Sequence, residues 1–308
     1  MKRTLAIILA LTLAMSLVAC GGAPSGEIKE PSNVVTDNIA KDTQPTEAAQ
    51  EEAAEEATAP EAEVTISEAV LVDEAGVKIV AKSLSTDDLF GPEIKLLIEN
   101  NSGKDLTFQC RNASVNGYMV ETMMSVDVVD GKKANDSLTF MNSDLEACGI
   151  DAIADMEFSF HIFDMAEWET YLDTDAIQIK TSIADTYEYS YDDSGDLAYD
   201  GNGVKVVIKG LAEDSFYGPS IVVYIENTRE DGVTVQVRDV SINGFMVDPM
   251  FSCDVSAGKH AIDTITFMDT ELEENEIDTI EDVELSFHIF NMEDWETIVD
   301  TEVVNISF

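Results

Sequence analysis

The chain has 308 residues, enough for about two domains, and 45% of them are apolar, so most of it can bury a core. It carries 62 acidic and 17 basic residues, a net charge of −45. This excess excludes nucleic acid as a natural partner and excludes electrostatic docking on anionic lipid, because both need a basic face. With three His and four Cys, little material exists for a transition-metal site, and we expect no metal and no cofactor.

Residues 1–19 have the pattern of a secretory signal peptide. Lys2 and Arg3 precede the apolar run Leu5–Val18, which is too short to span a bilayer. The run ends in Leu-Val-Ala-Cys, which resembles a bacterial lipobox. The resemblance implies that Cys20 is acylated and becomes the first residue of the mature chain. Membrane lipid, held through acylated Cys20, is then a partner on the extracytoplasmic side of the cell membrane. Ordinary signal cleavage, with Cys20 unmodified, is the alternative.

Residues 20–63 predict a disordered acidic tether after this Cys. The segment is rich in Ala, Glu, Pro, Thr and Ser, contains no aromatic residue and has no sustained apolar period. As a coil it would span roughly 35–40 Å. It would therefore hold the rest of the chain away from the membrane.

The remainder of the sequence is one unit written twice. Gly-Val-Lys-Ile-Val at 76–80 recurs as Gly-Val-Lys-Val-Val at 203–207, and Phe-His-Ile-Phe at 160–163 recurs at 287–290. The shift is 127 positions in both cases, and it holds without a gap. This period is far longer than that of a solenoid or propeller, so each copy is predicted to be a whole domain.

Both copies, 64–183 and 184–308, are predicted to be all-β. Short aliphatic runs are separated by turn residues, and Asn116-Gly117 is a strong hairpin signal. In Phe158–Phe163, apolar residues alternate with Ser and His, as in a strand that is buried on one side. The spacing of the runs favours a sandwich or a barrel.

Two further segments carry a family resemblance. Ile-Glu-Asn-Asn-Ser-Gly-Lys-Asp at 98–105 and Ile-Glu-Asn-Thr-Arg-Glu-Asp at 225–231 each follow an aliphatic run. They resemble the strand–Asn–turn signature of immunoglobulin-like domains in Gram-positive lipoproteins. The resemblance implies two tandem immunoglobulin-like antiparallel β-sandwiches and brings no catalytic residue with it. The Cys…Trp…Cys spacing of true immunoglobulin domains is missing.

Matching polar stripes at a spacing of two residues end in Arg111 and Arg238. Thr107, Gln109 and Arg111 in the first copy correspond to Thr, Gln and Arg at 234, 236 and 238 in the second. The two Arg residues could read a ligand on a sheet face. Alternatively, each could pair with a nearby carboxylate, since acidic residues are so abundant.

Trp168 and Trp295 occupy equivalent places, each between two acidic residues. A surface Trp can stack on a sugar or anchor a protein partner. The alternative is a lid over the edge of the sandwich.

Three other features, a pair of His residues, a pair of Cys residues and an acidic loop, could be either purely structural or chemically functional. His161 and His288 lack nearby His or Cys partners in the sequence, which favours a structural role. Cys110 and Cys148 could form a disulfide or stay as thiols. The acidic loop 192–202 could bind calcium or be a solvated turn, and it lacks the EF-hand spacing.

The sequence thus predicts a membrane-anchored lipoprotein that acts as a non-catalytic binding or spacing module at the cell envelope. No nucleophile elbow, phosphate loop or dinucleotide fingerprint occurs, so we expect that the chain is not an enzyme. The expected partner is an envelope protein, a peptide or a glycan. An accessory subunit of an envelope transporter or enzyme, and a purely structural surface protein, are the alternatives.

Overall fold

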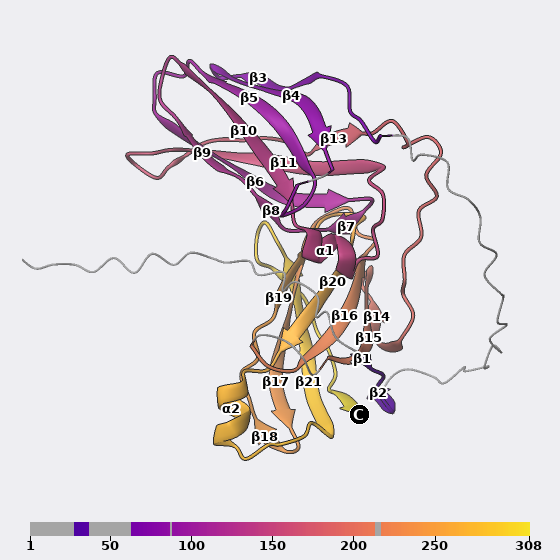
Figure 1. Cartoon of the computed structure of the whole chain (residues 1–308). Helices are drawn as coiled ribbons and strands as arrows, with labels where there is room; N and C mark the ends of the chain where they lie inside the picture. The colour runs from indigo at the N-terminus through magenta and orange to yellow at the C-terminus, as the bar shows by residue number, and fades with distance from the viewer. Residues whose placement is uncertain (1–27, 37–62, 87, 213–216) are drawn as a thin grey trace, which may run out of the picture.

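The computed structural model describes residues 28–36, 63–86, 88–212 and 217–308, and these form two β-sandwiches (Figure 1). Strands account for 56% and helices for 5% of the structure, which confirms the predicted all-β class. In the described part of the chain, every helix is too short or too polar to cross a bilayer. Cys20 and most of the expected tether lie outside the described residues.

The first sandwich consists of two sheets joined by a short helix. One sheet contains, in order, β3 (Ala69–Glu74), β4 (Val77–Ser85), β5 (Glu93–Asn100), β10 (Lys132–Phe140) and β8 (Thr122–Met123). The other contains β7 (Tyr118–Met119), β6 (Leu106–Val115), β11 (Asp155–Asp164) and β12 (Thr170–Asp173), with β9 (Ser125–Val128) on β6 and β13 (Ile177–Lys180) on β11. Helix α1 (Asn142–Ala147) lies between β10 and β11 in the chain.

The second sandwich repeats this plan. One sheet contains β14 (Asp196–Gly201), β15 (Val204–Ala212), β16 (Ser220–Asn227) and β20 (His260–Thr266), with β1 (Ile28–Lys29) on β15. The other contains β18 (Phe245–Met246), β17 (Val233–Ile242), β21 (Asp282–Asn291), β23 (Val304–Ser307) and β2 (Asn33–Thr36), with β19 (Ser252–Val255) on β17 and β22 (Thr297–Asp300) on β21. Helix α2 (Asp269–Glu274) is the equivalent of α1.

Each sandwich has its own apolar core, built by the predicted alternation of side chains. On β11, Phe158, Phe160 and Ile162 are almost fully buried between the sheets, whereas His161 points to the other side. The second core contains the equivalent residues of β21. Among the described residues, all strand pairings are antiparallel except the short contact of β7 with β20.

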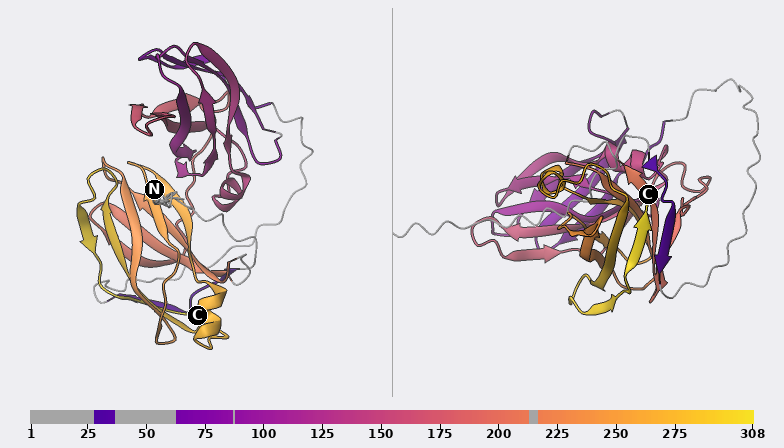
Figure 2. Two further views of the ribbon diagram at one scale, coloured as in Figure 1. Left: turned by 90° about the vertical axis from the view of Figure 1, so that its left-hand side faces the viewer. Right: turned by 90° about the horizontal axis from the view of Figure 1, so that it is seen from below.

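The segment 28–36 departs from the predicted tether. It forms β1 and β2, which extend both sheets of the second sandwich: Ile28 is opposite Ala212, and Val34 is opposite Ile306. Figure 2 shows β2 beside the C-terminal strand. The prediction of disorder was therefore wrong for these residues, because the exposed edges of β15 and β23 offer backbone groups that an extended segment can pair with.

The sandwiches meet where β7 of the first lies beside β20 of the second (Figure 1). The amide of His260 donates a hydrogen bond to the carbonyl of Gly117 over 2.9 Å. Tyr118 lies opposite His260 and packs in a small apolar cluster with Val207 and Tyr224 on the outer face of the second sandwich. The hairpin end of one sandwich thus docks on the sheet face of the other.

A second set of contacts closes this joint. Tyr191, from the connecting segment, stacks on His260 with ring centroids 3.7 Å apart. His260 shares a 2.7 Å hydrogen bond with the Tyr224 hydroxyl. Burial, together with the charge of Lys259, lowers the pKa of His260 to about 4, so its ring is neutral at pH 7. Lys259 forms an ion pair with Glu157 across the joint, at 3.0 Å.

Replacing Gly210 tests whether β1 belongs to the fold. Gly210 has φ of 152°, and a Cβ there would lie 2.4 Å from the Ile28 side chain and 2.7 Å from the Lys29 carbonyl. We expect Gly210→Val to displace β1, destabilising the second sandwich by roughly 1–3 kcal/mol and accelerating amide hydrogen exchange at 28–36. The control is Ser83→Val. Ser83 is the equivalent of Gly210 on β4 and is exposed, so this variant should leave amide exchange at 28–36 unchanged. Full protection of 28–36 in Gly210→Val would contradict the pairing.

Candidate binding face

A strip of three aromatic rings runs along the outer side of β11. His161 lies 5.4 Å from Phe163, and Phe163 lies 5.7 Å from Trp168 at an interplanar angle of 22°, measured between ring centroids. His161 Nδ1 is 2.5 Å from the Asp173 carboxylate on β12, which fixes the His ring. Trp168 is 70% exposed, whereas the Phe163 beneath it is buried. One face of the indole is therefore packed, and the rest of the ring faces solvent.

The second sandwich carries the same strip on β21. The centroid distances are 5.1 Å from His288 to Phe290 and 5.7 Å from Phe290 to Trp295, with Trp295 74% exposed. His288 Nδ1 lies 2.6 Å from Asp300. These contacts support the prediction that His161 and His288 have a structural role. We call the two sets of His, Phe and Trp the aromatic strips.

A tight turn after each strand holds the Trp in place. Trp168 and Trp295 have φ of 59° and 63°, a left-handed conformation that a bulky side chain rarely adopts. The Trp168 amide donates to the Asp164 carbonyl at 2.9 Å, and the Trp295 amide donates to the Asn291 carbonyl at 3.1 Å. The side chains of Asp164 and Asn291 accept further amides of the turn. Their short polar side chains explain why the chain turns here.

The predicted polar stripes lie on the same outer faces as the aromatic strips. Across the β6–β11 ladder, Gln109 is opposite His161 and Thr107 is opposite Phe163. Arg111 is two residues further along β6, opposite Ser159. The structure therefore joins in one face two features that the sequence presented separately. We call the stripe and the strip of each copy together its candidate face.

Arg238 is connected to the strip of the second copy through Asp300. Its guanidinium lies 3.8 Å from the Asp300 carboxylate that also contacts His288. This contact supports the local ion pair as the role of Arg238. For Arg111, the described residues include no carboxylate within ion-pair distance. The Phe and Asp members of these faces were missed in the sequence, although Phe follows His by two residues in both copies.

Acidic residues flank both Trp residues in the chain. Glu167 and Glu169 flank Trp168, and Asp294 and Glu296 flank Trp295. The Lys104 ammonium, 2.7 Å from Asp164, lowers the pKa of that carboxyl below its usual value. Such a surface attracts cations and repels polyanions. An exposed indole can also bind a cation or the apolar face of a sugar ring.

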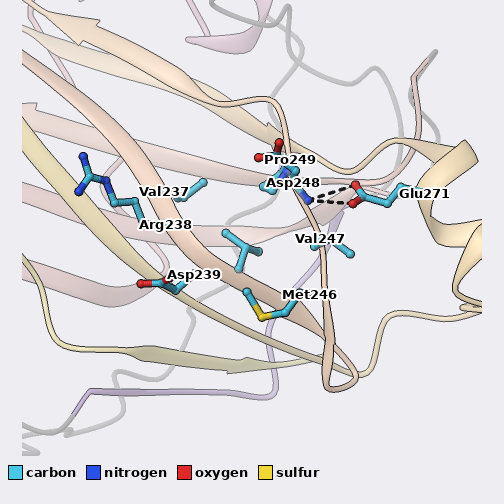
Figure 3. A pocket seen from close by; sticks show the side chains of 9 residues that line it. Val237, Arg238, Asp239, Met246, Val247, Asp248, Pro249 and Glu271 are labelled. Atoms are coloured by element: carbon cyan, nitrogen blue, oxygen red, sulfur yellow. Dashed lines mark hydrogen bonds between the residues drawn. The ribbon is translucent and has the colours of Figure 1, made fainter.

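A shallow pocket of about 360 Å³ lies beside Arg238 in the second sandwich (Figure 3). The Asp248 amide donates two hydrogen bonds, of 3.0 and 3.2 Å, to the Glu271 carboxylate at its far end. Pro249 replaces Thr122 of the first copy, and of the pairing that β8 makes there the second copy keeps the isolated bridge between Met250 and Thr266. The pocket marks this local loss of pairing and has no buried charged group aimed into it.

The other predicted sites have structural explanations. Cys110 and Cys148 are thiols, and burial raises the pKa of Cys110 to about 12. In the acidic loop, Lys209 lies 2.8 Å from Asp192 and lowers its pKa to about 2, and Lys205 lies 2.6 Å from Asp193. Two carboxylates that could serve calcium are therefore engaged by lysines of β15. No cluster of three or more potential metal ligands occurs in the described parts of the chain.

Comparisons with known proteins assign no family to the chain. No family model and no curated protein matches the chain. A search of solved structures finds a red sea bream transglutaminase, with 9% sequence identity and a TM-score of 0.18. The match covers 70% of this chain and 28% of the transglutaminase, so the chain spans a minor part of that enzyme.

This match corrects one sequence prediction. The expectation that the chain is not an enzyme is contradicted, because the matched structure is that of an enzyme. At this identity and TM-score, the likeness assigns no activity, substrate or catalytic residue to the chain.

The backbone at Trp168 gives a test of the turn geometry. Because left-handed φ costs an L-residue about 1 kcal/mol, we expect Trp168→Gly to be more stable than Trp168→Ala by about that amount. Urea unfolding followed by circular dichroism measures the difference. At the neighbouring Glu167, the order should be reversed, with Ala more stable than Gly. Greater stability of Trp168→Ala would show that the turn is not left-handed in solution.

Proposed function

We propose that this protein is a lipid-anchored binding module of the cell envelope, and that its two candidate faces take hold of a partner through Trp168 and Trp295. The acylated Cys20 would keep the chain on the extracytoplasmic side of the membrane. In this proposal the sandwiches serve as a rigid support for the faces.

The observation that carries the proposal is the duplicated exposure of a constrained Trp. An indole that is 70% or 74% exposed contributes little to a core, and its left-handed backbone costs stability. The packed Phe and the Asx-type turn hold it in one orientation before any ligand arrives. Preorganised aromatic rings of this kind are typical anchors of binding sites.

The charges around the faces narrow the class of partner. Carboxylates outnumber cations near both indoles, so a polyanion would be repelled. A basic peptide could use both cation–π contact and ion pairing, and a neutral glycan could stack on the indole edge. The proposed partner is therefore a basic or uncharged component of the envelope.

Intrinsic fluorescence tests this proposal directly, because the chain contains only two Trp residues. We expect a lysine-rich peptide or an N-acetylglucosamine oligomer, titrated separately, to shift the Trp emission, and a polyanion such as heparin to leave it unchanged. Trp168→Ala and Trp295→Ala should each retain roughly half of the bound ligand, since each variant keeps one face.

The matched control is Phe245→Ser, which removes an exposed aromatic ring outside the candidate faces. It should bind as the parent chain does. If neither probe shifts the emission, or if the double Trp variant binds the same probe with unchanged affinity by calorimetry, the proposed binding faces are wrong.

The anchor has a separate test. Cys20→Ser removes the thiol that would accept the acyl group, and two or more acyl chains give firm membrane attachment. We expect the expressed parent chain to sediment with membranes and the Cys20→Ser variant to be recovered in the soluble fraction. Equal membrane association of the two would exclude lipidation at Cys20 as the anchor.

A further inference from the structure

The joint between the sandwiches is a contact that joins two different surfaces of one repeated unit. The first copy contributes the tip of its Asn-Gly hairpin, where Tyr118 and Met119 are 3% and 8% exposed. The second copy contributes the outer row Leu197–Val207–Tyr224. Because the chain is a duplication, each copy has an equivalent of both surfaces.

The hairpin tip of the second copy is uncovered. Phe245 and Met246, the equivalents of Tyr118 and Met119, are 49% and 64% exposed. A Cβ at Gly117 would meet the Tyr191 hydroxyl at 2.6 Å, whereas one at Gly244 would have open space around it. The second copy therefore presents the same docking element, with an apolar tip, and the described chain provides no surface over it.

The row that receives a hairpin recurs on the first copy. Val70 is opposite Val80, and Val80 is opposite Leu97, in the register of Leu197, Val207 and Tyr224. Val70 is 54% exposed. Leu97 is half-buried and Val80, in the middle of the row, is 6% exposed, so the apolar area open to a partner on β3, β4 and β5 is centred on Val70.

The charges at the joint are also preserved in the open surfaces. The ion pair between Lys259 and Glu157 has equivalents in Lys132, at the start of β10, and Glu284, on β21. Both of these residues are exposed. Lys132 belongs to the open receptor surface and Glu284 to the open hairpin end, so the pair could form only between two molecules.

We propose that a second copy of this chain docks its Phe245–Met246 hairpin on the Val70–Val80–Leu97 row, with Glu284 of one molecule facing Lys132 of the other. The contact is heterologous: it uses the hairpin of one molecule and the row of the other, so the first molecule keeps an open row and the second keeps an open hairpin. Association of this type produces closed rings or open linear arrays rather than a two-fold dimer.

The contact between molecules is weaker than the joint within one molecule. Leu97 and Lys133 replace Tyr224 and His260, so the hydrogen bond and the ring stack at the joint have no equivalent. The connecting segment with Tyr191 is also absent from the open surface. We therefore expect reversible association that grows with protein concentration.

Sedimentation velocity on the chain from residue 20 with Cys20→Ser tests the proposal without a contribution from lipid. From about 5 to about 500 µM, the weight-average sedimentation coefficient should rise. The double variant Phe245→Ser/Met246→Ser should remain monomeric over this range. Leu89→Ser, which removes a still more exposed apolar residue at 84% outside the contact, should associate as the parent does.

Charge reversal distinguishes this specific contact from non-specific association. Lys132→Glu should raise the concentration for half-association roughly tenfold, because Glu284 would then face a like charge. Combining Lys132→Glu with Glu284→Lys should restore association, and both substitutions lie at exposed positions that folding tolerates. A sedimentation coefficient independent of concentration, or association unaffected by the hairpin and charge variants, would overturn the proposal.

Discussion

The alternation of side chains along β11 and β21 determines both the core and the candidate faces. Burial of Phe158, Phe160 and Ile162 between the sheets forces the residues between them outward. His161 and Phe163 therefore lie on the outer side, in line with the turn that carries Trp168. A shift of one residue in this ladder would place polar groups in the core. Packing of the core therefore fixes the strand register, and the register fixes which residues form the candidate face.

The two copies show how a common framework acquires different surroundings. The His–Asp contact and the Phe–Trp stack are almost identical in both, with Phe–Trp centroid distances of 5.7 Å. The hairpin tips differ, because Tyr118 is buried at the joint and Phe245 is exposed. Within one chain, the same turn thus serves as a structural contact in one place and as an open surface in the other.

Local patterns in the sequence predicted most of the fold. The Asn-Gly turns and the alternation in Phe158–Phe163 were sufficient, because both are properties of a few consecutive residues. The pairing of 28–36 with β15 and β23 could not be predicted, since its partners lie far away in the chain and the segment itself is polar. The ion pair between Lys209 and Asp192 was also missed. Acidic residues are so abundant that the sequence does not show which of them pairs with a given lysine.

The candidate face was predicted only in pieces, as Arg111, Arg238, Trp168 and Trp295. Sequence spacing places the stripe on β6 and the Trp after β11, but only the antiparallel register brings Gln109 opposite His161 and so joins them. The left-handed Trp could not be foreseen, because its conformation depends on the turn hydrogen bonds of Asp164.

The buried joint constrains how the two faces could work together. His260 is neutral, stacked on Tyr191 and hydrogen-bonded to Tyr224, so separating the sandwiches would expose this cluster and the Lys259–Glu157 ion pair at once. A joint of this kind restricts the sandwiches far more than a flexible linker would. Two faces held in fixed relation gain avidity only from a partner whose binding groups match their separation. The joint would then select for a partner with a regular repeat, such as a polymer, over one with a single binding group.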